Sequence, residues 1–181
     1  MSLENAKQNL KEFGKELNLE GLNFDENNTC ILGIDNTFSL HLTYEPNSDR
    51  LYLYAPILDG LPKDTNTKLK LYEALMEGSM LGGLMAGGGV GVAVREELIL
   101  MHAVLEMGSG TDANSLRRFA PLFVECVERW RKKVKDLLEG VEEFVPRDWA
   151  APPEQHMAQQ HQQRPPGKDE GFSPGDKFKK V

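Results

Sequence analysis

The chain has 181 residues, which is enough for one domain with its own core and an additional segment. Its formal net charge of −7 argues against a nucleic-acid-binding protein, which needs a basic face, and against an anionic membrane surface as partner. No run of about 18 apolar residues could span a membrane, and no secretory signal is visible at the N-terminus, so we expect a cytoplasmic protein.

The chain begins with a predicted helix. Apolar residues recur there every three or four positions and form one stripe: Leu3, Ala6, Leu10, Phe13 and Leu17. A polar turn region, 23–28, separates this helix from the next elements.

Three short segments rich in β-branched and aromatic residues predict strands: 29–35, 38–44 and 50–58. Turn residues at 35–36 and 45–49 predict two hairpins. Large side chains occupy both faces of the first and third strands, whereas one face of a small antiparallel sheet usually contacts water. Two interpretations stay open: the second face is a docking surface for a partner, or helices cover both faces.

A second helix is predicted from about 66 to 81, with Asp64 or Thr65 as its N-cap. It has two apolar stripes. One stripe is formed by Leu69, Tyr72, Met76 and Met80, and the other by Leu71, Ala74, Leu75, Gly78, Leu81 and Gly82. One face can serve the core of the domain, so the other must be covered by something else.

The segment after this helix, GSMLGGLMAGGGVGVAV (78–94), is rich in glycine but does not fit a phosphate-binding loop. It lacks the Gly-Lys-Ser/Thr ending, and a strand follows where an anion site needs a helix. Ala74, Gly78 and Gly82 recur every four residues and leave a strip that another backbone can approach closely. We interpret the glycines as packing at a subunit interface; the alternative is an internal turn that merely tolerates glycine.

Another hairpin, 90–95 with 98–106, and a final helix over about 112–138 complete the predicted domain. Gly140 should end that helix, and Pro121 should kink it or break away its first turns. The element order αβββαββα predicts an α+β domain, an antiparallel sheet with packed helices, over residues 1–140.

The remaining segment, 141–181, is rich in proline and glutamine and is expected to be a disordered tail that is dispensable for folding. His156 and His161 lie in it and are expected to be plain solvated side chains. Cys30 and Cys126 are expected to be reduced core thiols. We find no convergent set of catalytic, cofactor-binding or metal-ligating residues and therefore expect no enzyme.

The element order, the acidic composition and the doubly apolar second helix resemble the class I type III secretion chaperones, the CesT/SycE-like family. Four segments carry the resemblance: NTCILGIDNTFSLHLTYEP, DRLYLYAPILDGLP, LYEALMEGSMLGGLMAGGGVGVA and LILMHAVLEM. It covers about residues 1–140 and is most similar in detail to a chlamydial member that serves several cargoes. The tail departs from the shorter family norm.

This resemblance implies a cytoplasmic homodimer that binds N-terminal segments of secreted effectors and keeps them non-globular for the secretion ATPase. It implies no enzymatic activity and no nucleotide site. For the dimer interface it implies Leu71, Ala74, Leu75, Gly78 and Gly82. For cargo contact it implies Leu10, Phe13, Ile31, Phe38, Leu53 and Tyr54.

Two other classes of function remain as alternatives. A small-molecule-binding α+β domain would use the same sheet as a pocket and would need no unfolded partner. An enzyme would need a convergent polar site.

Overall fold

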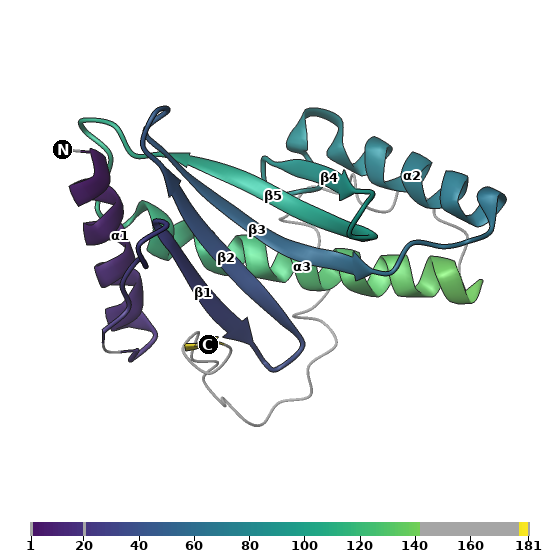
Figure 1. The fold of residues 1–181 in the computed structure, drawn as a ribbon, viewed down its shortest axis with the longest axis horizontal. Helices are drawn as coiled ribbons and strands as arrows, with labels where there is room; N and C mark the ends of the chain where they lie inside the picture. The colour runs from purple at the N-terminus through teal and green to yellow at the C-terminus, as the bar shows by residue number, and fades with distance from the viewer. Residues whose placement is uncertain (1, 20, 142–177, 181) are drawn as a thin grey trace, which may run out of the picture.

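A computed structural model of the protein describes residues 2–19, 21–141 and 178–180. The elements in chain order are α1 (Ser2–Glu16), β1 (Thr29–Ile34), β2 (Phe38–Glu45), β3 (Arg50–Asp59), α2 (Thr65–Ser79), the 3-10 turn η1 (Met80–Gly82), β4 (Gly89–Ala93), β5 (Leu98–Glu106), α3 (Ser115–Glu139) and β6 (Phe178–Lys180). This order confirms the predicted αβββαββα fold and adds one strand, β6, after it (Figure 1).

The strands form a single sheet in the order β4-β5-β3-β2-β1-β6, in which every neighbouring pair is antiparallel. Asp35 and Asn36 connect β1 and β2 with left-handed backbone angles, φ 45° and 55°. Short polar residues tolerate that conformation, and two positive φ angles in succession are those of the central residues of a type I′ turn, which the N–H of Thr37 closes by donating to the backbone oxygen of Ile34 at 2.8 Å. The sequence therefore sets the register of β1 on β2 at this turn.

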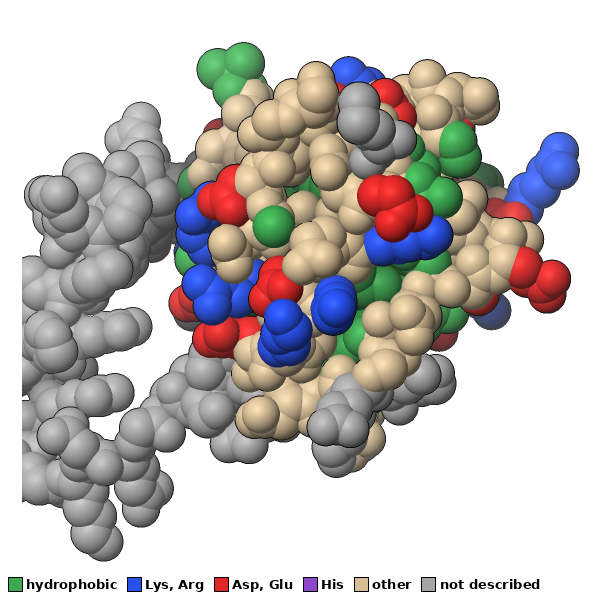
Figure 2. Space-filling model, turned by 90° about the vertical axis from the view of Figure 1, so that its left-hand side faces the viewer, with side chains coloured by type: hydrophobic (Ala, Val, Ile, Leu, Met, Phe, Trp, Pro, Cys, Tyr) green, Lys and Arg blue, Asp and Glu red, His purple; other side chains and the backbone are tan. Residues whose placement is uncertain are grey.

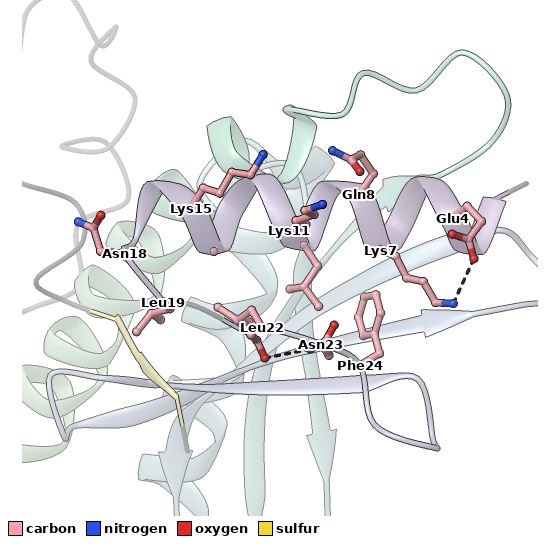
Figure 3. Close-up of a pocket in the computed structure, with 13 residues that line it drawn as sticks. Glu4, Lys7, Gln8, Lys11, Lys15, Asn18, Leu19, Leu22, Asn23 and Phe24 are labelled. Atoms are coloured by element: carbon pink, nitrogen blue, oxygen red, sulfur yellow. Dashed lines mark hydrogen bonds and ion pairs between the residues drawn. The ribbon is translucent and has the colours of Figure 1, made fainter.

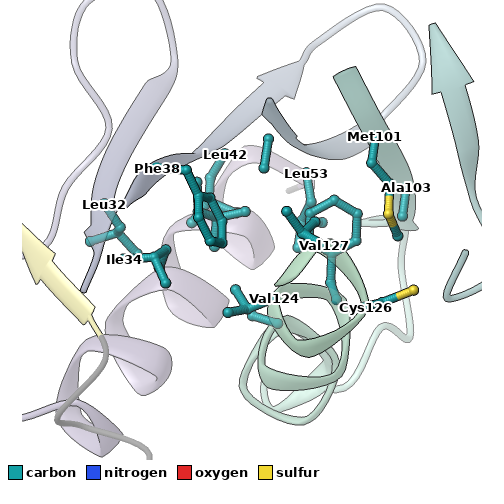
Figure 4. Close-up of a cluster of buried hydrophobic side chains, with 14 of the residues drawn as sticks. Leu32, Ile34, Phe38, Leu42, Leu53, Met101, Ala103, Val124, Cys126 and Val127 are labelled. Atoms are coloured by element: carbon teal, nitrogen blue, oxygen red, sulfur yellow. The ribbon is translucent and has the colours of Figure 1, made fainter. Parts of the chain in front are cut away.

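One face of the sheet forms the core. Burial alternates strictly along β2 and β3, so every second side chain points to this face. α3 runs behind the sheet in Figure 1, and Figure 4 shows its Val124 and Val127 pointing toward Phe38, Leu42 and Leu53 of the strands. These five side chains are all at least 92% buried, so the sheet and α3 share one apolar interior.

Two asparagines fix α1 to the rest of the domain. Asn9 is fully buried, and its side-chain oxygen accepts a hydrogen bond from the backbone N–H of Leu116 at the start of α3, at 3.0 Å. Asn5 donates to the backbone oxygens of Met107 and Gly108, at 3.1 and 2.9 Å. A buried amide is tolerated only when it is hydrogen-bonded, so these contacts specify where α1 lies.

The helix ends match the predicted signals except at Pro121. Asp64 caps α2 by accepting from the backbone N–H of Thr67 at 2.7 Å, and Gly140 ends α3 with φ 68°. Pro121 lies inside α3, which continues as one helix from Ser115. Of the two predicted outcomes, the break of the first turns is wrong, because the helix continues through the position where proline removes one backbone donor; the kink stays a prediction.

Part of the segment expected to be disordered is ordered. Phe178–Lys180 form β6 and pair with β1, whereas residues 142–177, with His156 and His161, lie outside the described residues. The prediction of disorder is wrong for these three residues. A three-residue strand carries too little sequence pattern to be recognised, and the edge of β1 orders it through backbone pairing.

Candidate functional site: a groove beside α1 and the open face of the sheet

A groove of about 790 Å³ lies between α1 and the segment that follows it, residues 18–24. Leu10, Leu19, Leu22 and Phe24 contribute its apolar part, and Figure 3 shows the last three on the connecting segment below the helix. Leu10 and Leu22 are buried, whereas Leu19 and Phe24 are half-buried. All four side chains belong to the core or pack against it, and Leu19 and Phe24 keep part of their apolar surface accessible in the groove.

The groove exists because the chain turns back sharply at the end of α1. Asn18 takes a left-handed conformation, φ 53°, and the N–H of Leu19 donates to the backbone oxygen of Gly14 at 2.9 Å. A Cβ atom at Gly14 would lie 3.0 Å from the backbone oxygen of Leu19 and 3.2 Å from the Cβ atom of Leu22. Glycine at position 14 therefore permits the close approach of the returning segment to the helix.

Charged side chains border the groove. Lys7, Lys11 and Lys15 are spaced by four residues along α1, so they lie on one side of the helix. Lys7 pairs with Glu4 at 3.1 Å and Lys15 with Glu12 at 2.8 Å. The hydrogen bond from Lys15 holds the pKa of Glu12 below its usual value. Figure 2 looks onto this side of the molecule and shows basic and acidic side chains interspersed around apolar ones.

The second candidate surface is the sheet face opposite the core, which no described element crosses in Figure 1. One row across four strands is formed by Ile31, His41, Tyr54 and His102, which are paired in register. The rings of His41 and Tyr54 stack with their centroids 4.9 Å apart. Partial burial lowers the pKa of His41, which favours its neutral form in this stack.

The next row across the open face is more polar. Thr43 contacts Thr29 at 2.9 Å and the Tyr54 hydroxyl at 3.3 Å between oxygens, and Tyr52 opposes Val104. The open face thus combines aromatic rings, hydroxyls and two partly exposed aliphatic side chains, Ile31 and Val104. This mixture differs from the purely apolar core face.

The structure places the six predicted cargo-contact residues in two groups. Ile31 and Tyr54 lie on the open face, with Ile31 36% exposed and Tyr54 half-buried. Four others are core residues: Leu10, Phe13, Phe38 and Leu53, each at most 8% exposed. Of these four only Leu10 also lines the groove. The apolar stripe of α1 therefore faces inward. Three groove residues were missed: Phe24 lies in the region 23–28, which was interpreted only as a polar turn, and Leu19 and Leu22 precede that region and were assigned to no element.

The five residues predicted for a dimer interface are buried within the chain itself. Leu71, Ala74 and Leu75 are at most 6% exposed. A Cβ atom at Gly78 would lie 2.2 Å from the ring of Trp130 in α3. The strip of small residues therefore accommodates an indole ring of the same chain, where the sequence analysis expected the backbone of a second chain.

The glycines after α2 likewise make close contacts inside the chain. A Cβ atom at Gly82 would lie 2.6 Å from the carbonyl carbon of Gly87, and one at Gly88 would lie 1.8 Å from the backbone oxygen of His102. Trp130 donates from its indole N–H to the backbone oxygen of Leu84 at 2.8 Å and holds this turn. The alternative interpretation, an internal turn, accounts for these glycines.

The other stripe of α2 is mostly exposed: Leu69, Met76 and Met80 are exposed, and Tyr72 is half-buried. Leu81, which the sequence pattern places in the buried stripe, is exposed as well. Six large apolar side chains on neighbouring elements form what we call the α2–β4 patch: Leu69, Met76, Met80, Leu81, Val92 and Val94. Met76 is 72% exposed, Met80 68% and Leu81 99%. Leu81 also has a left-handed backbone, φ 54°, which an L-residue other than glycine, asparagine or aspartate rarely adopts.

The described part of the chain contains no helix long and apolar enough to cross a membrane, and no group of three or more side chains arranged to hold a metal ion. Cys30 and Cys126 are both buried, and neither of them is in a disulfide. The Cys126 thiol lies 3.2 Å from the backbone oxygen of Leu84, and burial raises its pKa. These two cysteines are separate core residues and form no site.

The fold is that of the type III secretion chaperones. Residues 8–131 match the model of the Tir chaperone protein (CesT) family, and the chain belongs to this family. The family is one of non-catalytic chaperones, which confirms the expectation that this protein is not an enzyme. Its function as a type III secretion chaperone that binds effectors is likewise confirmed.

Three solved structures are similar to the chain. A chain of the HopA1–SchA chaperone–effector complex is 28% identical, with a TM-score of 0.59, over 73% of this chain and 97% of that one. A chain of the ExsC–ExsE complex is 16% identical, with a TM-score of 0.60, over 72% and 94%. A chain of the structure of the Yersinia pestis type III secretion chaperone SycH in complex with a stable fragment of YscM2 is 18% identical, with a TM-score of 0.51, over 68% of this chain and 98% of that one. A comparison with curated proteins found no match.

Proposed function

We propose that this protein is a cytoplasmic homodimer that holds N-terminal segments of secreted effectors in extended form and serves several cargoes. The observation that carries the proposal is the groove beside α1, where the side chains of Leu19 and Phe24 pack against the core on one side and stay partly accessible on the other. In an extended effector segment every second side chain points to the same side, so its apolar side chains can contact the apolar floor of this groove.

Backbone pairing at the neighbouring sheet edge adds to the affinity. The edge of β1 already pairs with an extended segment, β6, so its N–H and C=O groups are in a geometry suited to strand addition. Such pairing does not depend on the side chains of the added strand. This independence favours a chaperone that accepts several different effectors, as the resemblance to a multi-cargo member implies.

The rim of the groove sets a second preference. Lys7, Lys11 and Lys15 stand beside the apolar floor, and Lys11 lies between the two lysines that are paired with glutamates. An effector segment that carries Asp or Glu next to its apolar anchors fits this rim better than a basic one. The charged rim keeps an empty groove hydrated, and the apolar floor supplies most of the binding free energy.

The homodimer forms through the α2–β4 patch. A cluster of exposed methionine and leucine side chains on one region is typical of a surface that a partner covers. The predicted interface residues Leu71, Ala74, Leu75, Gly78 and Gly82 then lie beneath this surface and support it through Trp130. Two cargo sites in one dimer raise the effective concentration of a second effector segment. The loaded dimer delivers its cargo to the secretion ATPase, the partner that the resemblance implies.

The proposal is tested by co-expressing N-terminal segments of candidate effectors with the full chain and measuring complex formation by size-exclusion chromatography with light scattering. Replacing Phe24 by Ala should weaken capture by about 1–2 kcal/mol, because it removes one anchor of the groove. Leu122→Ala is the matched control, since Leu122 is 61% exposed on α3 and does not line the groove. Capture of folded globular proteins alone, or binding of a small molecule alone, would contradict the proposal.

A further inference from the structure

The C-terminal strand β6 occupies an edge of the sheet at the site proposed for cargo. Its three residues pair antiparallel with the second half of β1, in the register Leu32↔Lys180, Gly33↔Lys179 and Ile34↔Phe178. In Figure 3 this strand passes at the Leu19 end of the groove, and Figure 1 places it on the same side of the sheet as the C-terminal end of α1. The chain therefore brings its own extended segment to the groove.

Without β6 the strand β1 would be the outer strand on this side of the sheet. An uncovered edge strand presents a row of backbone N–H and C=O groups that pair with any extended chain, so natural proteins cover or shorten such edges. β6 covers only the half of β1 from Leu32 to Ile34; the described β6 pairs with none of the residues from Thr29 to Ile31. The cover is therefore short, and a strand that runs along all of β1 would make more backbone pairs than β6 does.

We propose that β6 is a built-in competitor for cargo, which closes the β1 edge in the empty chaperone and is displaced when an effector segment binds. This inference rests on the proposed function. The N–H and C=O groups of β1 between Leu32 and Ile34 that face away from β2 cannot pair with β6 and with a cargo strand at once, so the two are mutually exclusive. The competitor is indifferent to cargo sequence because it competes for backbone groups.

The competition has a measurable consequence for affinity. The apparent dissociation constant equals the intrinsic constant divided by the fraction of chaperone with an open edge. If β6 closes the edge in nine molecules of ten, its removal tightens binding about tenfold, and if it closes two of three, about threefold. Competition with β6 would favour cargo segments that are long enough to pair along all of β1, and it would disfavour short strands that pair with only part of it.

The first arm of the test asks whether β6 protects β1, and it needs no effector. Hydrogen exchange of the full chain is compared with that of a chain ending at Lys177, with the region 29–34 as readout. We expect faster exchange there in the shortened chain and unchanged exchange in β3. Adding a peptide of residues 171–181 to the shortened chain should restore the slow exchange. Equal exchange in the two chains would overturn the inference.

Two double variants separate backbone pairing from charge. Consecutive residues of a strand direct their N–H groups to opposite sides, so Lys179→Pro with Lys180→Pro removes one donor that faces β1. Lys179→Ala with Lys180→Ala removes both charges and keeps both donors. The proline pair should behave as the shortened chain and the alanine pair as the full chain. The reverse result would contradict displacement by backbone competition.

The second arm measures the affinity of one effector segment, identified by the capture experiment above, for all four chains. The shortened chain and the proline pair should bind about three- to tenfold more tightly than the full chain and the alanine pair. Equal capture by all four contradicts this inference alone. Failure of all four to capture any effector segment contradicts the proposed function, and this inference with it.

Discussion

The α1 side and the α2–β4 side of this domain both present apolar surface, but of opposite kinds. Beside α1 the surface is hollow, and half-buried Leu19 and Phe24 lie under a rim of lysines. On α2 and η1 the side chains of Met76, Met80 and Leu81 are largely exposed to solvent. A hollow with a charged rim stays hydrated when empty and suits a ligand that must leave again. A projecting apolar surface suits a partner that stays.

The comparison also separates residues that look alike in sequence. Phe13 and Phe24 are eleven positions apart on the same stretch of chain, and only the second is accessible. Gly78 and Gly91 belong to the same glycine-rich run, and only the first is in close contact. Each such pair gives a test in which one variant should be costly and its match should not.

The largest effect is expected at Phe13. Its side chain is fully buried, so Phe13→Ala should lower the free energy of unfolding by about 3–5 kcal/mol. Phe24→Ala should cost less than half as much, because Phe24 is only half-buried. Urea unfolding followed by circular dichroism measures both. If Phe13→Ala left stability intact and abolished cargo capture, Phe13 would be a cargo-contact residue and its assignment to the core would be wrong.

The next effect concerns the α2–β4 patch. Met76→Glu combined with Met80→Glu places two like charges in a surface that is apolar, and should weaken the dimer by about 2–4 kcal/mol. Both side chains are mostly exposed, so the fold should persist. Analytical ultracentrifugation over a concentration series measures the dissociation constant, with Leu122→Glu as control. A wild-type chain that sediments as a monomer at micromolar concentration would remove the basis for this prediction.

A smaller effect is expected at Gly78. A methyl group there meets the ring of Trp130, so Gly78→Ala should lower the free energy of unfolding by about 1–3 kcal/mol. The contact is within one chain, and the loss should therefore not depend on protein concentration. Gly91→Ala is the matched control, because nothing lies within 4 Å of its Cβ position. If Gly78→Ala abolished the dimer without lowering the free energy of unfolding, Gly78 would lie in the subunit interface.

The smallest effect is expected at the rim of the groove. Lys11→Gln should weaken the binding of an acidic effector segment by at most about 1 kcal/mol, because the charge is exposed to water. The difference from wild type should shrink as salt is raised from 0.05 to about 0.5 M, since screening removes it. Isothermal titration calorimetry at both salt concentrations, with Lys70→Gln on α2 as control, measures it.

Local signals in the sequence predicted the elements well. Strand alternation, the Asp64 cap and Gly140 each depend on neighbours within a few residues, and all three have the expected structure. The two stripes of α2 could not be assigned in this way, because both are apolar. Their assignment depends on Trp130, 52 positions after Gly78, which fills the strip of small residues.

The candidate site was less predictable than the fold for the same reason. In the sequence Asn9 is a polar residue beside an apolar stripe, and its burial is explained by two hydrogen bonds, one accepted from Leu116 and one donated to the backbone oxygen of Asn5. The groove depends on the return of the chain over Gly14, a tertiary contact that no periodicity reports. The pairing of β6 with β1 joins residues more than 140 positions apart. The burial of Asn9, the groove and the position of β6 all depend on tertiary contacts, which local sequence patterns do not report.

Site-specific cross-linking can show whether effector segments lie in the groove beside α1. A photoreactive phenylalanine analogue is placed at Gln8, which lines the groove, and in separate proteins at Met80 and at Leu122. The chaperone is then loaded with an effector segment by co-expression and irradiated. We expect a cross-link to the effector from position 8, a cross-link to a second chaperone chain from position 80, and none from position 122. An effector cross-link from position 80 or 122 with none from position 8 would contradict this expectation.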